Sequence, residues 1–282
     1  MAITNRYDFI MLFDVENGNP NGDPDAGNTP RMDAETGYGY ITDVCLKRKI
    51  RNFVELAKEG ESGYNILVKP DKALNTRFAE AYDAEQLERG KKGKKADDVK
   101  KARDYMCRNY FDVRAFGAVM STGDNPCGIV RGPVQITFAR SLSQINIEDV
   151  TITRQARTTE DRQETGGTEM GRKSIIPYAL YRAEGYISAA LAQKVTGLSD
   201  DDVELLWDAI VNMFENDHSA ARGKMCMRKL YIFKHDSTLG NCPSHVLFDK
   251  VEVSLKEEKP PRQFADYTIH VDEAMPVGVT LI

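Results

Sequence analysis

The chain has 282 residues, 41% of them apolar and 29% charged, and a formal net charge of −5 at pH 7. This length and apolar content predict a soluble protein with one main core and insertions. The acidic balance excludes nucleic-acid binding through bulk positive charge, so a nucleic-acid partner must be held by local basic patches.

The five cysteines are scattered and include no CxxC pair, which favours free thiols in a reducing compartment over a disulfide framework. The N-terminal stretch MAITNRYD lacks the apolar region of a signal peptide, and no apolar run approaches the length of a membrane span. We therefore expect a cytoplasmic protein without a membrane partner.

Residues 7–15, YDFIMLFDV, alternate as a strand does when one face is buried. The expected core face carries Tyr7, Phe9, Met11, Phe13 and Val15. A long loop, 16–33, follows, and residues 42–58 then repeat apolar side chains at helical spacing after a capping Thr42. The apolar face of this helix carries Leu46, Ile50, Phe53, Val54 and Ala57.

Residues 71–110 are highly charged and mostly helical in pattern, and we expect residues 60–110 to form an insertion that projects from the core. Within it, RGKKGKKADDVKKAR (89–103) is rich in lysine, and its two glycines predict a break between helices. Segments 1–59 and 111–282 form the expected core domain.

The core resumes with an alternating strand at 134–138, and a phase slip between Ile147 and Val150 predicts a bulge. Residues 155–173 are almost free of apolar residues and predict an exposed hairpin that turns at Gly166 and Gly167. In residues 174–191, strand and helix periods are hard to separate.

A helix is expected from Ser199 to residue 214, followed by a strand at 228–235 and a last strand at 267–272. The resulting order, β-α-β-β-α-β, is typical of the ferredoxin-like fold, which RNA-recognition domains share. The predicted fold class is therefore α+β.

The helix at 42–58 carries Lys47, Arg48, Lys49 and Arg51 within its first two turns. Basic residues at this end oppose the helix dipole, and helix N-termini bind phosphate through free N–H groups. The simplest interpretation is a solvated polar face, but a phosphate bound nearby accounts better for the placement of the charges.

Three interpretations compete for the loop ENGNPNGDPDAGNTPRMD (16–33): a plain connection, a carboxylate metal site and a backbone cradle for phosphate. Asp23, Asp25 and Asp33 suggest a metal. However, a proline interrupts the pattern of a calcium loop, and its twelfth position is Ala34 rather than a carboxylate. A structured turn with backbone-mediated contacts is therefore favoured.

Asparagine and glycine adopt positive φ readily, so successive N–H groups of this loop can converge on an anion. Arg31 adds a fork of further donors. In the polar hairpin, Met170 is a candidate wedge between bases, a role that apolar side chains play in some nucleic-acid complexes.

Other patterns are weaker. Residues 114–121, RAFGAVMS, partly match a strand motif of RNA-recognition domains, although Phe116 is better explained as a core residue. Four possible zinc ligands fit no familiar spacing: Cys226, His235, Cys242 and His245. Walker A, GxSxG and HExxH motifs are absent from the sequence, so hydrolase and kinase functions lack support.

Four stretches, NPNGDPDAGNTPR, TDVCLKRKIR, FDVRAFGAVMS and LYIFKHDS, occur in this order. Together they resemble the backbone-subunit family of the CRISPR surveillance complex Cascade, subtype I-C, of the RAMP superfamily. The likeness covers nearly the whole chain. It implies an RRM-like palm, a helical finger at 60–110 and a β-hairpin thumb at about 155–173. It also implies a subunit without nuclease activity or cofactor.

The resemblance further implies that copies polymerise head to tail along one guide RNA, beside large, small and guide-processing subunits, and present the guide to target DNA. The RNA-contacting positions that it suggests are Asn19, Asn21, Arg31, Lys47, Arg48, Lys49, Arg51, Arg154, Arg157, Met170, Arg172 and Lys173. The candidate DNA contacts at the finger tip are Lys91, Lys92, Lys94 and Lys95.

Two other functions stay open. A related backbone family of type III systems cleaves target RNA with an aspartate of the corresponding loop, which makes Asp23, Asp25 and Asp33 candidates for a metal-dependent ribonuclease. A pure protein scaffold, by contrast, needs no RNA. In either assembly, the acidic stretch 200–208 is a candidate contact with a basic surface of a neighbouring copy.

Overall fold

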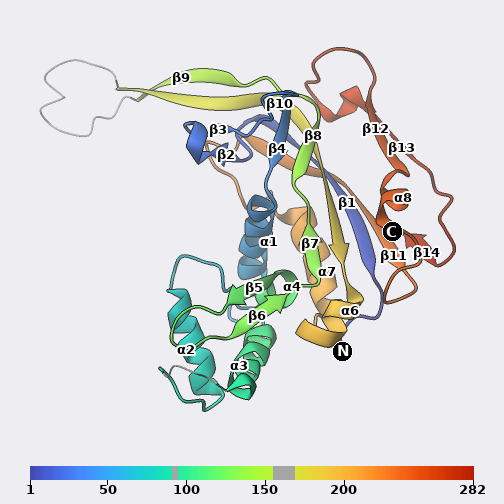
Figure 1. Cartoon of the computed structure of the whole chain (residues 1–282). Helices are drawn as coiled ribbons and strands as arrows, with labels where there is room; N and C mark the ends of the chain where they lie inside the picture. The colour runs from blue at the N-terminus through green and yellow to red at the C-terminus, as the bar shows by residue number, and fades with distance from the viewer. Residues whose placement is uncertain (91–94, 155–168) are drawn as a thin grey trace, which may run out of the picture.

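The computed structural model describes residues 1–90, 95–154 and 169–282. Its centre is an antiparallel sheet in which the strands follow the order β14-β11-β1-β10-β8-β4, with β7 and β9 also paired to β10 (Figure 1). These strands are β1 (Tyr7–Gly18), β4 (Tyr38–Ile41), β7 (Val134–Ile136), β8 (Ala139–Gln144), β9 (Glu148–Arg154), β10 (Glu169–Ile187), β11 (Lys224–His235) and β14 (Val279–Leu281).

Strand β1 lies in the middle of the sheet, between β10 and β11. The five side chains predicted to face the core are buried on one face, as the alternation indicated. Ile10 and Leu12 are fully buried on the other face, so both sides of the strand are covered. Central strands buried on both faces carry apolar residues in an almost continuous run, which the sequence YDFIMLF shows.

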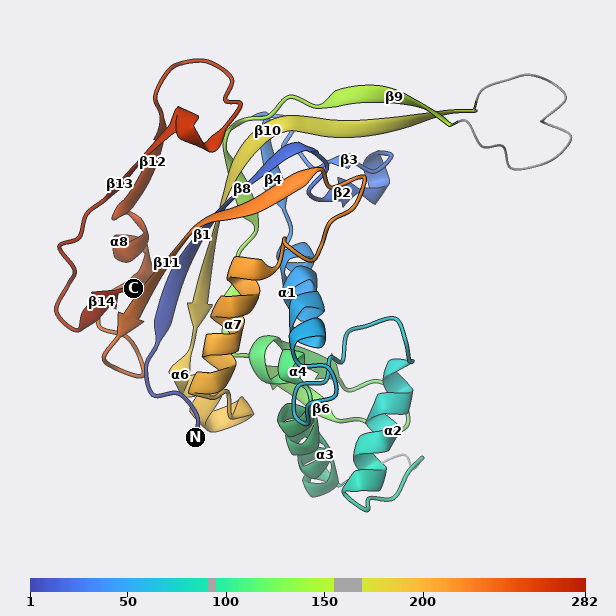
Figure 2. The ribbon, with the colours of Figure 1, turned by 180° about the vertical axis from the view of Figure 1, so that it is seen from behind.

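Helices α1 (Asp43–Ala57) and α7 (Asp200–Asn212) cover the first face of the sheet (Figure 2). Both begin at the predicted residues, because the Thr42 hydroxyl accepts a hydrogen bond from Cys45 N–H and the Ser199 hydroxyl accepts one from Asp202 N–H. Leu46, Ile50 and Val54 are buried as expected, whereas Ala57 is exposed at the last turn.

The opposite face is covered by α8 (Ser244–Phe248) and the hairpin of β12 (Val251–Leu255) and β13 (Tyr267–Val271). The strand predicted last, at 267–272, is therefore outside the main sheet. The last strand is β14, which pairs with the edge of β11. A three-residue strand is too short for its alternation to be recognised in the sequence.

The charged insertion forms α2 (Leu74–Ala84) and α3 (Ala96–Asn109), which share a second core with β5 (Gly117–Met120) and β6 (Gly128–Arg131). Met120, Cys127 and Val130 follow residue 110 in sequence but belong to this second core. The partial strand motif at 114–121 is a strand only over β5, since α4 (Phe111–Phe116) covers its first three residues. Phe116 is a core residue, as expected.

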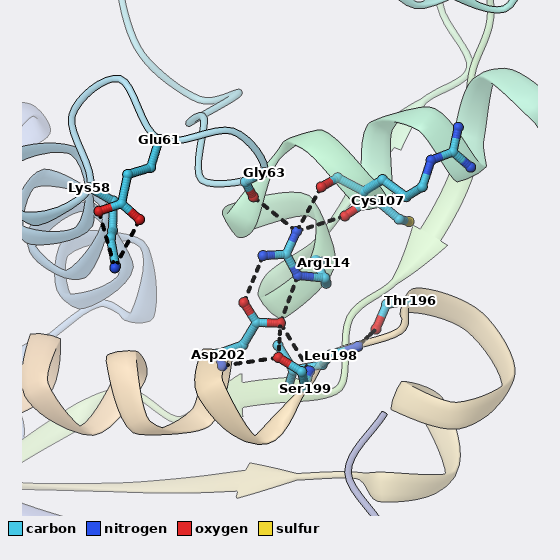
Figure 3. Close-up of polar contacts among 10 residues, drawn as sticks. Lys58, Glu61, Gly63, Cys107, Arg114, Thr196, Leu198, Ser199 and Asp202 are labelled. Carbon is cyan, nitrogen blue, oxygen red and sulfur yellow. Dashed lines mark hydrogen bonds and ion pairs between the residues drawn. The ribbon is translucent and has the colours of Figure 1, made fainter. Parts of the chain in front are cut away.

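Helix α4 joins the two cores through a buried ion pair (Figure 3). Arg114 Nε and Nη2 donate to the two carboxylate oxygens of Asp202 at 2.8 and 2.7 Å, and Nη1 donates to the carbonyl oxygens of Gly63 and Cys107. Asp202 is 2% exposed, so it does not belong to an acidic outer surface. Asp200, Asp201, Glu204 and Asp208 remain exposed.

The predicted bulge between Ile147 and Val150 is wrong, because the phase slip marks the end of β8 and the start of β9. Strand β9 pairs with the first residues of β10, and the two project from the sheet as a hairpin (Figure 1). The predicted turn at Gly166 and Gly167 lies outside the described residues. Phe138 is half exposed and follows β7 instead of ending it.

Residues 174–187 continue as β10, and the short helical turns α6 (Ala189–Leu191) and η2 (Ala192–Thr196) come after it. The first loop contains three small elements: β2 (Gly22–Asp23), η1 (Pro24–Ala26) and β3 (Thr29–Pro30). The turn η3 (Phe264–Asp266) precedes β13. Among the described residues, no helix has both the length and the apolar character needed to cross a membrane.

Candidate nucleic-acid interface

Two aspartates of the first loop, Asp23 and Asp33, hold its backbone in place. Asp23 accepts a hydrogen bond from Asp25 N–H and forms an ion pair with Arg31 at 3.4 Å. Asp33 accepts from Glu35 N–H at 3.0 Å, and this backbone hydrogen bond is the main cause that lowers the pKa of its carboxyl group. In the parts of the chain that the structure describes, these carboxylates form no metal-binding group.

Asn21 and Asn19 tie the loop to the rest of the fold. The Asn21 side-chain oxygen accepts from the Thr42 N–H and hydroxyl at 3.0 and 3.1 Å, which fixes the loop to the start of α1. Asn19 donates from its amide nitrogen to the Asn28 carbonyl at 2.7 Å. Positive φ occurs at Asn17, Gly27 and Asn28 of this loop, which are residue types that adopt it readily.

The loop is held close to residues 217–223, which precede β11. Asn19 N–H donates to the Ala221 carbonyl at 2.8 Å. A Cβ atom at Gly18 would lie 1.9 Å from the Arg222 carbonyl oxygen, so only glycine permits this approach of the two backbones. These contacts place Arg222 beside the first turns of α1.

Three adjoining hollows follow this side of α1, and we call them together the α1 groove. One of about 450 Å³ lies between α1, the first loop and residues 217–222, and one of about 480 Å³ lies between α1 and residues 68–74. They share Val44, Arg48 and Asn52. A third, of about 240 Å³, shares Asn19, Asn28 and Ala221 with the first and reaches β10.

The four basic residues predicted on α1 have different environments. Arg48 is exposed, lines two hollows of the groove and has no hydrogen bond or ion pair to any described residue. Lys47 is paired with Asp43 at 2.9 Å, and Arg51 is paired with the buried Asp112 at 2.8 Å. The tertiary structure thus supplies carboxylate partners for two of the four charges that the sequence interpretation placed near a phosphate.

Lys49 is 3% exposed and forms an ion pair with Asp217, whose carboxylate also contacts Arg222. Its ammonium is therefore not presented at the surface. Arg222 lines the groove and keeps about a third of its side chain exposed. The sequence interpretation missed this residue because its only signal is one arginine in a polar loop between a helix and a strand.

Two further basic residues that the sequence interpretation missed, Lys69 and Lys72, line the groove beside α2. Their carboxylate partners are exposed, so these pairs contribute little and leave the ammonium groups accessible. Val44, Val68 and Leu74 are exposed apolar side chains in the same hollow. The groove thus combines basic and apolar side chains, which suits phosphates and bases respectively.

At the other end of the groove, Arg172 and Lys173 of β10 line the third hollow. Lys173 Nζ donates to the Ala220 carbonyl at 2.9 Å, and Arg172 lies 3.6 Å from Asp149 with 73% of its side chain exposed. Met170 is 75% exposed on the hairpin. Arg154 is the last residue of β9, and Arg157 lies outside the described residues.

The remaining candidates lie elsewhere. Arg31 is paired in the first loop, and Lys95 is exposed at the start of α3. Lys91, Lys92 and Lys94 lie outside the described residues. His235 is buried, with Nε2 3.0 Å from the Asp8 carboxylate and Nδ1 accepting from Asn241 N–H, so its ring serves the core and not a zinc ion.

Comparisons with known proteins agree on one family. The family model for CRISPR-associated protein Cas7 matches residues 5–272. A CRISPR-associated protein Cas7 from Haloferax volcanii is 26% identical over 302 residues, covering 97% of this chain and 82% of that protein.

Solved structures give a fold comparison. A chain of a "CRISPR RNA-guided surveillance complex, pre-nicking" is similar with a TM-score of 0.51 and 16% identity, covering 81% of this chain and 78% of that chain. A chain of the "Type III-B Cmr-beta bound to cognate target RNA" gives a TM-score of 0.43 and 12% identity, covering 81% of this chain and 61% of that chain. The mixed fold with its antiparallel sheet is therefore similar to that of the chain from the pre-nicking surveillance complex. Because the family model spans nearly the whole sequence, the chain belongs to the Cas7 family of CRISPR-associated proteins.

Proposed function

We propose that this chain is an RNA-binding backbone subunit that polymerises along CRISPR guide RNA in a type I-C Cascade complex and presents the guide to target DNA. The observation that carries the proposal is the α1 groove, where Arg48 is exposed and unpaired among the described residues and Arg222, Arg172 and Lys173 continue the basic lining. The subunit needs no side chains that recognise bases, because phosphate contacts position the guide RNA and its base pairing with the target supplies sequence specificity.

The architecture supports the finer parts of the proposal. The strand order β11-β1-β10-β8, with α1 and α7 on one face, is that expected of a ferredoxin-like palm. In this assignment the second core around α2 and α3 is the finger, and the hairpin of β9 and β10 is the thumb. The partners are further copies of the chain and the large, small and guide-processing subunits, in the cytoplasm.

We also propose that the subunit is not a nuclease. Asp23 and Asp33 are engaged by backbone N–H groups, and Asp23 is also paired with Arg31, so these carboxylates already have structural partners. The test is incubation of the assembled complex with complementary RNA and Mg²⁺. Cleavage at regular intervals that is lost in Asp23→Ala, Asp25→Ala or Asp33→Ala would establish the type III activity instead.

The RNA-binding proposal is tested with Arg48→Gln and a labelled single-stranded RNA. Removal of one charge-assisted phosphate contact should weaken binding about tenfold and reduce the salt dependence of log K by about one. The matched control is Arg131→Gln, an exposed arginine of β6 without a hydrogen-bond or ion-pair partner among the described residues. Equal affinities of both variants and the parent would contradict the proposal and favour a pure protein scaffold.

A further inference from the structure

A separate hollow of about 470 Å³ lies on the face of the sheet opposite α1, and we call it the Arg228 hollow. It is bounded by β11 and by the segment around η3. Its lining includes Glu16, Tyr178, Lys224, Arg228, Arg262 and Phe264. The proposed guide-binding role assigns nothing to this hollow, although three of these residues are basic.

The guanidinium of Arg228 is held in one orientation. Its Nε donates to the Asp14 carboxylate at 2.8 Å, and the Tyr178 hydroxyl donates to the same oxygen at 2.8 Å. The Asp14 side chain is 3% exposed, so this anchor is shielded from water. The Arg228 Cζ atom also lies 5.5 Å from the centre of the Phe264 ring. A guanidinium fixed in this way loses little conformational entropy when it binds a ligand.

The donors that remain point to an anionic ligand. The two terminal nitrogens of Arg228 have no acceptor among the described residues, and the Arg262 guanidinium has no carboxylate partner there. Lys224 is 3.4 Å from Glu16, but both side chains are exposed, so this pair is weak. The lining residues and Asp14 together carry three positive charges, on Lys224, Arg228 and Arg262, and two negative charges, on Asp14 and Glu16. One positive charge is therefore in excess.

We infer that the Arg228 hollow binds a backbone phosphate of a nucleic-acid strand, as a second site on the face of the sheet opposite the α1 groove. Two guanidinium groups with free N–H donors suit a phosphate, which accepts from a planar fork. Continuity also favours nucleic acid, because Lys224 is two residues from Arg222, which lines the α1 groove. The inference rests on the proposed function, since both sites take the same class of ligand.

The test compares the double variant Lys224→Gln/Arg262→Gln with the charge-matched control Lys194→Gln/Arg131→Gln, whose residues are exposed and lie outside both sites. The probes are labelled single-stranded RNA and DNA oligonucleotides of one sequence. The double variant should bind at least one probe about tenfold more weakly, with a salt slope reduced by about two, whereas the control should match the parent. The probe affected identifies whether guide or DNA phosphates occupy the hollow.

A second variant, Arg228→Lys, keeps a cation beside Asp14 but removes the planar fork, so it should weaken binding while the melting temperature is retained. If Arg48→Gln weakens binding and no variant of the hollow does, the inference is wrong and the proposed function stands. If neither set weakens binding, both fail. Loss of self-association with unchanged oligonucleotide affinity would also overturn the inference, because the ligand would then be an acidic surface of a second copy.

Discussion

Two arginines in different regions of the molecule, Arg48 in the α1 groove and Arg114 at the junction of α4 and α7, carry the same charge but have opposite environments. Arg114 is 8% exposed and donates to both oxygens of Asp202, so it links α4 to α7 (Figure 3). Arg48 is exposed and meets no described partner. Residue type alone therefore does not identify a binding residue; burial and pairing do.

The largest effect is expected at the junction. Arg114→Met leaves Asp202 without its guanidinium partner in a buried position, so the free energy of unfolding should fall by about 3–5 kcal/mol. Urea denaturation measures the change, with Arg131→Met as the exposed control. The double variant Arg114→Met/Asp202→Leu should recover part of the loss, because no buried charge then remains unpaired. If Arg114→Met were as stable as the parent chain, the claim that Arg114 is structural while Arg48 is available for binding would be wrong.

Within α1 itself, Lys49 should behave like Arg114 and not like its neighbour Arg48. Lys49→Met removes a buried partner of Asp217, and the retained contact with Arg222 limits the expected loss to about 1–3 kcal/mol of unfolding free energy. Arg48→Gln should change stability by less than about 0.5 kcal/mol. Denaturation of both variants, beside their RNA affinities, separates structural from binding lysines and arginines. Equal stability losses would show that the burial argument is wrong.

The close approach of two backbones that shapes the groove gives an effect of similar size. Gly18→Ala forces the first loop and residues 221–223 apart, which should cost about 1–3 kcal/mol of stability. It should also weaken RNA binding, since Arg222 moves with the backbone. Gly171→Ala is a suitable control, because the added methyl group meets only the side chain of Ile152. Unchanged RNA affinity in the Gly18 variant would show that the close approach of the loop to residues 221–223 does not position Arg222 for RNA binding.

The smallest expected effect concerns Cys45, which lines the groove beside Arg48. Burial is the main cause that raises the pKa of its thiol above the usual value of a cysteine, so the thiolate becomes abundant only at more alkaline pH. Iodoacetamide should therefore react more slowly with Cys45 than with a free cysteine at pH 8, and guide RNA should slow it further. Mass spectrometry of the modified peptide measures both rates. If Cys45 were modified as rapidly with guide RNA as without it, the RNA would not occupy the α1 groove beside Cys45.

Local features of the sequence predicted much of the fold. The caps at Thr42 and Ser199, the alternation of β1 and the apolar face of α1 depend on residues within a few positions of one another, and the structure has them except at Ala57. The helical character of the charged insertion is confirmed for the same reason. The errors fall where periodicity is short or ambiguous, at the step from β8 to β9 and at the three-residue β14.

The candidate site depends instead on contacts between distant segments. The sequence by itself determined that basic residues gather in the first turns of α1 beside a loop of Asn, Gly and Pro. Only the tertiary structure decided which of them are available, because Asp112 and Asp217 come from other elements and neutralise Arg51 and Lys49. It also brought Arg222 and Lys173 to the same groove, across intervals of the chain over which no local pattern carries information.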